Sequence, residues 1–225
     1  MAEYPFAVYL HAHDVPGYGC DFGHDKNQNS LLSIVTGIGK SSTSIHLKVP
    51  KNATATDVSD ALRALVKDSG RKIRVVIVNA HGAPGEVKLG AGIKESKVDA
   101  FSNIKNVFSA VNNGFILYCC NTAASGLDTN LMRIERDYGT AAALMYAVLD
   151  DNSPRGKGTG HSLIKKWSQT SGVDVSAPYE VQVAPVMVLG EAVWRPSGYF
   201  KGNWVRAHPN GKLVEHSSWT NPRMR

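Results

Sequence analysis

The chain of 225 residues has three cysteines, no long apolar run, no leader-like start and no internal repeat. Three cysteines, two of them adjacent, cannot form a disulfide framework, so we expect a reducing compartment or a thiol kept for chemistry. No segment approaches the ~20 apolar residues of a membrane span. The opening MAEYPFAVYLHAHD has no basic segment before an apolar core, which predicts a cytoplasmic protein or delivery by a signal-peptide-independent secretion route.

The sequence also has no basic stripe interleaved with aromatic residues. Lysine and arginine outnumber the acidic residues, 25 against 19, but they are scattered along the chain. A solvated basic surface fits this distribution better than a nucleic-acid interface does. We therefore expect no nucleic-acid partner, and the oligomeric state stays undefined.

Apolar periodicity predicts alternating strands and helices. Short β-branched or aromatic runs predict strands at residues 5–10, 44–49, 73–78, 115–119, 173–176 and 179–189. Helical spacing predicts helices at residues 58–66, 98–111, 140–149 and 161–170, the first of them capped by Thr56 and ended by Gly70. This order predicts an α/β fold whose mostly parallel sheet is flanked by helices on both faces.

The length favours a single domain over residues 1–225, with a core of about residues 5–190. We expect residues 191–225 to form a β-hairpin-like extension, and residues 150–160 to form a flexible linker. A set of aromatic residues is expected to cover a sheet face, with ligand binding as the alternative: Trp194, Tyr199, Trp204 and Trp219. His161 and His208 have no partner pattern and are expected at the surface.

Two predicted strands end in residues that can do chemistry. One ends in Asn79-Ala80-His81-Gly82 and the other in Tyr118-Cys119-Cys120. Functional groups of open α/β sheets gather where parallel strands end. If these strands are neighbours, an imidazole meets a thiol, which is the arrangement for nucleophilic catalysis. Side-chain alternation places Cys119 in the packed core and Cys120 at the mouth of the site.

The two blocks HGAPGEVKLG, residues 81–90, and ILYCCNTAASG, residues 116–126, resemble the His and Cys blocks of caspase-like (clan CD) cysteine peptidases. That group includes caspases, legumain, gingipains, clostripain, separase and the bacterial CHAT domains, and the bacterial members resemble this sequence most. Residues 163–178 resemble the helix and strand that follow in these proteins. The resemblance covers residues 73–178, and it implies a caspase-like domain that cleaves peptide bonds.

The resemblance implies Cys120 as nucleophile and His81 as general base, with the N–H groups of Gly82 and Cys120 holding the oxyanion. His13 or Asp14 could steady His81. The resemblance also implies a pocket for the substrate side chain that precedes the scissile bond. Five polar residues lie in the regions that would line it: Asp21, Asp25, Asp174, Ser176 and Glu180. Such an acidic pocket would prefer arginine or lysine in a protein or peptide substrate. No cofactor and no metal are implied, whereas self-cleavage in residues 150–160 and a role as a bacterial effector are compatible with the resemblance.

Two other functions stay open from the sequence. The first is a catalytically silent caspase-like module that binds a protein. The second is a zinc-dependent hydrolase, because His11, His13, Cys20 and His24 offer the nitrogen and sulfur ligands that zinc prefers. The spacing of these four residues fits no common zinc motif.

Overall fold

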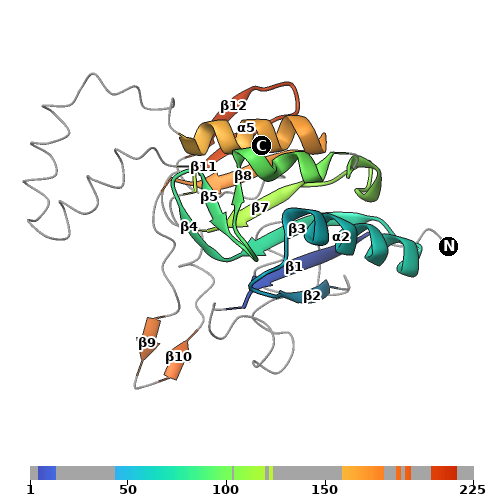
Figure 1. The fold of residues 1–225 in the computed structure, drawn as a ribbon, viewed down its shortest axis with the longest axis horizontal. Coiled ribbons are helices and arrows are strands. Elements are labelled where there is room, and N and C mark those ends of the chain that lie inside the picture. Colours follow the sequence, from blue (N-terminus) through green and yellow to red (C-terminus); the bar gives the residue numbers. More distant parts are fainter. Residues whose placement is uncertain are drawn as a thin grey trace, which may run out of the picture.

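The structure is a computed structural model that describes residues 5–13, 44–102, 104–119, 122–123, 159–179, 186–188, 191–193 and 204–216. Its centre is a seven-stranded sheet in the order β12-β11-β8-β7-β3-β1-β2 (Figure 1). Five of these strands are parallel: β1 (Phe6–Ala12), β2 (Ser44–Val49), β3 (Ile73–Asn79), β7 (Phe115–Tyr118) and β8 (Val175–Pro178). The predicted α/β fold with a mostly parallel sheet is therefore confirmed.

The last two strands form a hairpin that continues this sheet. β11 (Trp204–Ala207) runs antiparallel to β8, and β12 (Leu213–His216) runs antiparallel to β11. The expected β-hairpin at the C-terminal end of the chain is thus part of the main sheet. A small antiparallel sheet follows β3 and contains β4 (His81–Ala83), β5 (Glu86–Lys88) and β6 (Ile93–Lys94). A separate pair joins β9 (Val186–Val188) to β10 (Glu191–Val193).

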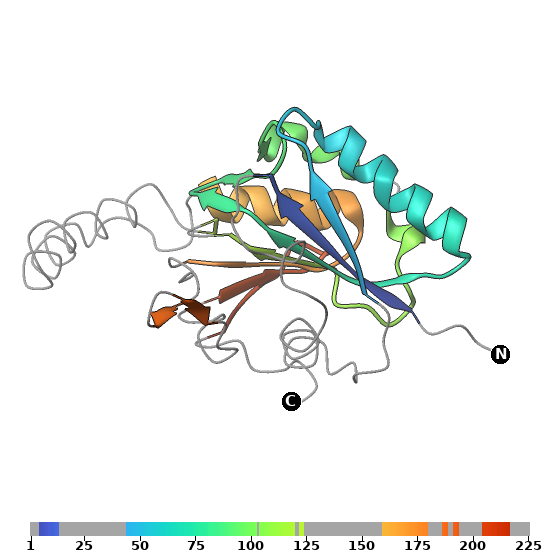
Figure 2. The same ribbon diagram turned by 90° about the horizontal axis from the view of Figure 1, so that it is seen from below.

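The helices of the described part of the chain lie on one face of the main sheet (Figure 2). They are α2 (Ala55–Ser69), α5 (Thr159–Ser171) and two 3-10 helices, η1 (Glu95–Phe101) and η2 (Lys105–Val107). Alternate strand side chains, such as Phe6, Val8 and Leu10 of β1, pack with these helices in the main hydrophobic core. Helices were expected on both faces, but the described helices cover only this one. The predicted helix 140–149 lies outside the described residues.

The predicted helix over residues 98–111 is wrong. Val98, Phe101, Ile104 and Val107 are all buried, and they recur every third residue. Three residues per turn is the period of a 3-10 helix, whereas an α-helix needs 3.6. The chain accordingly forms η1 and η2 there, and each buries its apolar stripe against α5, α2 or the sheet.

Smaller boundary predictions also need correction. The N-cap of α2 is Thr54 rather than Thr56, because Thr54 and Asp57 form a reciprocal capping box. Helix α5 begins at Thr159, inside the predicted linker. The predicted strand 179–189 is replaced, as far as it is described, by a bend at Tyr179 and the short β9. Within the described residues, no helix is both long and apolar enough to cross a membrane.

Candidate active site

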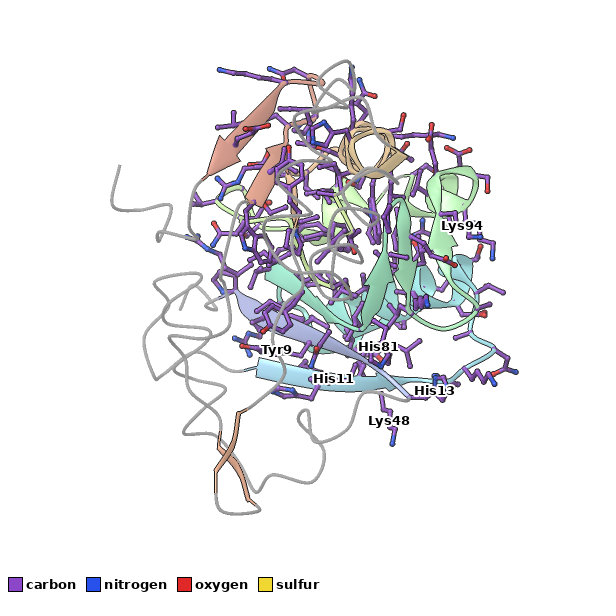
Figure 3. All side chains as sticks on the ribbon, turned by 90° about the vertical axis from the view of Figure 1, so that its left-hand side faces the viewer. Tyr9, His11, His13, Lys48, His81 and Lys94 are labelled. Carbon is purple, nitrogen blue, oxygen red and sulfur yellow. The ribbon has the colours of Figure 1, made fainter. Side chains whose placement is uncertain are left out.

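The two strand ends singled out in the sequence lie next to each other. β3 and β7 are adjacent and parallel, and their last paired residues are Asn79 and Tyr118. His81 follows Asn79 by two residues, and Cys120 follows Tyr118 by two residues. We call the side of the main sheet at which its parallel strands end the carboxyl edge; Figure 3 views it and labels His81 there with His11 and His13. Cys120 itself lies outside the described residues.

The neighbouring cysteine is a core residue, as its alternation predicted. Phe115, Leu117 and Cys119 share the helix-covered core, and Cys119 is fully buried. The Cys119 Sγ lies 3.6 Å from the Val78 carbonyl oxygen of β3. Cys119 is therefore a packing residue, and the prediction that it lies in the core is confirmed.

The chain just after Cys120 is held by backbone contacts to both sides. The Gly85 N–H donates to the Thr122 carbonyl oxygen at 3.2 Å, which joins the β4–β5 turn to this segment. The Ala123 N–H donates to the Pro178 carbonyl oxygen at 3.0 Å, which joins it to the end of β8. At Gly160 a Cβ would lie 2.3 Å from the Ala123 carbonyl carbon, so only glycine allows α5 to begin this close.

His81 is exposed and opens the antiparallel strand β4, where it pairs with Lys88. Gly82 follows it and pairs with Val87, whose buried side chain anchors this small sheet in the core. The imidazole is thus carried on a supported strand at the carboxyl edge. The tight turn of this hairpin contains Gly85, whose φ of 71° requires glycine.

A cluster of stacked rings occupies the other face of β1 and β2. The His46 ring stacks on the Tyr9 ring at 4.5 Å between centroids, and the His11 Nε2 lies 3.0 Å from the His46 Nδ1. The Asn79 Nδ2 lies 3.4 Å from the His11 Nδ1. Burial and, second, the neighbouring His46 lower the pKa of His11 to about 4, and burial raises the pKa of Tyr9. His11 is therefore neutral at physiological pH.

The zinc-ligand hypothesis gains no support from this cluster. Within the described part of the chain, no three histidine, cysteine or acidic residues are placed to hold a metal ion. His13, exposed at the end of β1, follows His11. Asp14, Cys20 and His24 lie outside the described residues.

Of the five expected pocket residues, the two that the structure describes, Asp174 and Ser176, lie away from His81. Asp174 immediately precedes β8, at the opposite edge of the sheet, where its Oδ1 lies 2.9 Å from the His208 Nδ1. Ser176 is buried beside Ile116 in mid-sheet and accepts a hydrogen bond from the Arg206 Nε at 3.3 Å. Burial lowers the pKa of Arg206, and Asp174 opposes that shift. Asp21, Asp25 and Glu180 lie outside the described residues.

Three residues that the sequence did not single out as a site meet at the carboxyl edge. The Tyr179 hydroxyl lies 2.5 Å from the His161 Nε2 and donates to the Glu215 Oε1 at 2.9 Å. His161 is buried, so its expected place at the surface is wrong; His208 is half-buried against Asp174. The sequence indicated this group only through the places of its residues along the chain. Tyr179 directly follows strand β8, and His161 lies in the first turn of helix α5.

No protein family, no curated protein and no solved structure matches this chain.

Proposed function

We propose that the protein is a cysteine peptidase in which Cys120 is the nucleophile and His81 the general base. The observation that supports this most directly is the register of β3 and β7. Asn79 and Tyr118 are paired, and the imidazole and the thiol each follow two residues later. A base within reach of a thiol is the geometric requirement of this chemistry.

The reaction would run in two halves. His81 takes the proton from the Cys120 thiol, and the thiolate attacks the carbonyl carbon of the scissile peptide bond. The N–H groups of Gly82 and Cys120 donate to the oxygen that becomes negative. The intermediate collapses, the C–N bond breaks, and His81 gives its proton to the leaving amine. Water, deprotonated by His81, then hydrolyses the thioester and restores the thiol.

Two observations near the proposed site support the peptidase function. The Gly85–Thr122 hydrogen bond joins the hairpin that begins at His81 to the segment that follows Cys120. The buried Cys119 anchors the other side of Cys120 in the core. Nucleophile and base would then be held by rigid elements on both sides, which limits the misplacement that slows catalysis.

A peptide-library digest with mass-spectrometric readout tests the proposal. The native chain should cleave peptides at a defined position, and Cys120→Ala and His81→Ala should each reduce kcat/KM by at least about 10³-fold, since nucleophile and base act as a unit. Cys119→Ala is the matched control. It removes a buried sulfur next to the nucleophile and should leave the cleavage pattern unchanged.

Labelling with iodoacetamide gives an independent readout of the thiol. Cys120 should be alkylated rapidly at neutral pH, and His81→Ala should slow its alkylation, because the imidazole stabilises the thiolate. Slow labelling of Cys120 that His81→Ala does not change, together with no cleavage of any peptide, would refute the peptidase and favour the silent binding module.

A further inference from the structure

Beside the N-terminus of α2, the structure has a cavity of about 390 Å³ that the proposed peptidase reaction does not use. Its walls come from the carboxyl halves of β1 and β2, the loop between β2 and α2, and the first two turns of α2. A volume of this size is in the range of small-molecule sites, about 300–1,000 Å³. Ligands of open α/β sheets bind where the strands end, and this cavity lies at that carboxyl edge.

The cavity has an apolar floor and a polar rim. Leu10, Val49 and Val58 line it and are buried, so they form the floor. Three polar residues also line it and are exposed, so they form the rim: Lys48, Asn52 and Asp57. The rest of the wall is aliphatic. This division fits a small ligand that has an aliphatic part and a polar or charged head.

The two charges on the rim are opposite and do not neutralise each other. Lys48 and Asp57 form no ion pair with each other or with any other residue in the described part of the chain. The hydrogen bonds that the Asp57 carboxylate accepts from the Thr54 N–H and hydroxyl both go to Oδ2, which leaves Oδ1 for a ligand. The same bonds, the one from the N–H first, lower the pKa of Asp57 and keep it ionised at neutral pH. A ligand head that carries both a cation and an anion would complement this rim.

The wall of the cavity is held in place by the backbone. The Ala53 N–H donates to the Pro50 carbonyl oxygen at 3.0 Å, and the Ala53 carbonyl oxygen accepts from the Ala91 N–H at 2.8 Å. Gly90 packs against that same carbonyl, since a Cβ at Gly90 would lie 2.2 Å from its oxygen. A wall that is already ordered lowers the entropic cost of binding a small ligand.

We propose that this cavity binds a free α-amino acid with a branched aliphatic side chain, for which leucine is the probe. The side chain would lie on the apolar floor, the ammonium group at Asp57 and the carboxylate at Lys48. The Asn52 amide can donate to or accept from the same head group. An α-amino acid carries both charges on one carbon, next to its aliphatic part, as the rim and floor require. This site is independent of the proposed peptidase function.

The test compares leucine with two analogues that each lack one charge. Isoamylamine is leucine without its carboxylate, and isocaproate is leucine without its ammonium group. Binding to the full chain is followed by NMR at the methyl signals of Leu47 and Val49, which line the cavity. The Kd of leucine should be lower than that of either analogue by about fivefold or more, as expected for one additional hydrogen bond to a charged group.

Two substitutions assign the two charges. Asp57→Asn should abolish the preference for leucine over isocaproate and keep the preference over isoamylamine. Lys48→Gln should do the reverse, because each variant removes the partner of one ligand charge only. Thr54→Ala removes the cap of α2 but keeps the Asp57 carboxylate, so it should keep both preferences and separate loss of the charge from fraying of the helix.

Asp60→Asn and Lys51→Gln are the matched controls. Asp60 lies one turn further along α2 and pairs with Arg63, and Lys51 is exposed in the loop before the helix; neither lines the cavity. Both preferences should survive in these variants, and their loss would reveal a general charge effect instead of a site. Methyl signals that do not move with leucine would overturn the proposal. Equal binding of leucine and the uncharged N-acetyl-leucinamide would overturn it too, and would assign the cavity to an apolar side chain of a protein.

Discussion

At the scale of single residues, the adjacent cysteines show when the burial of a side chain can be predicted from the sequence. Alternation along an apolar run predicts that Cys119 packs, and the structure buries it in the helix-covered core. His161 was expected at the surface because the sequence shows no partner for it, and that expectation is wrong: it contacts Tyr179, a residue 18 positions away that only the folded chain brings near. Contacts between distant residues leave no periodic signal. The pairing of Tyr179 with Glu215 was for the same reason invisible in the sequence.

His11 should make the fold sensitive to acid. Its folded pKa is lowered to about 4, whereas an unfolded histidine titrates near about 6.5. Below about pH 6.5 the unfolded chain therefore takes up a proton that the folded chain does not. The stability is complete above that pH and falls by up to about 3 kcal/mol as the pH drops to 4. Urea unfolding measured from pH 7.5 to 4.5 checks this.

Substitution isolates the contribution of His11 from that of other titrating groups. His11→Gln should flatten the fall of unfolding free energy with pH, whatever its effect on stability at neutral pH. His13→Gln is the control, because His13 is exposed and lies just after the end of β1. Parallel pH profiles for the native chain and His11→Gln would contradict the assignment of the acid sensitivity to this buried ring.

At the scale of elements, the sequence predicted strands better than helix boundaries. Continuous apolar runs predicted β3 and β7, because strands that are buried on both faces of a parallel sheet are apolar along their whole length. The region from η1 to η2 was assigned to one α-helix because a three-residue spacing approximates the helical period over one or two turns. Over residues 98–107 the two periods diverge by about half a turn, and the strict spacing of three decides the outcome.

The corrected N-cap of α2 gives an element-scale prediction. The Thr54 side chain accepts from the Asp57 N–H, and Asp57 accepts from the Thr54 N–H at 2.7 Å. Thr54→Ala should lower the unfolding free energy by about 1 kcal/mol. Thr56→Ala, two residues into the exposed first turn, should change it by less than about 0.5 kcal/mol. Equal effects in chemical denaturation would show that the capping box contributes nothing.

At the scale of the whole molecule, the topology explains why one edge collects the proposed chemistry. Parallel strands β1, β3, β7 and β8 all end at the carboxyl edge, so residues from four distant stretches converge there. The sequence predicted that the strands preceding His81 and Cys120 are neighbours, and β3 and β7 are adjacent and parallel. It did not predict that β12 adds Glu215 to the same edge, because a hairpin after residue 191 can pair with the sheet or stand apart. Only the β8–β11 pairing decides between those alternatives.

The pairing of β11 with β8 predicts that the β11–β12 hairpin unfolds together with the rest of the main sheet. Trp204 opens β11, is fully buried and pairs with Pro178 of β8, so the hairpin contributes to the core and not only to the surface. Trp204→Ala should lower the free energy of the single unfolding transition by about 3–5 kcal/mol. Lys212→Ala, in the exposed β11–β12 turn, should leave it unchanged. If the hairpin were instead a separate extension, Trp204→Ala would not move the main transition in thermal circular dichroism, because the rest of the sheet would unfold independently of it.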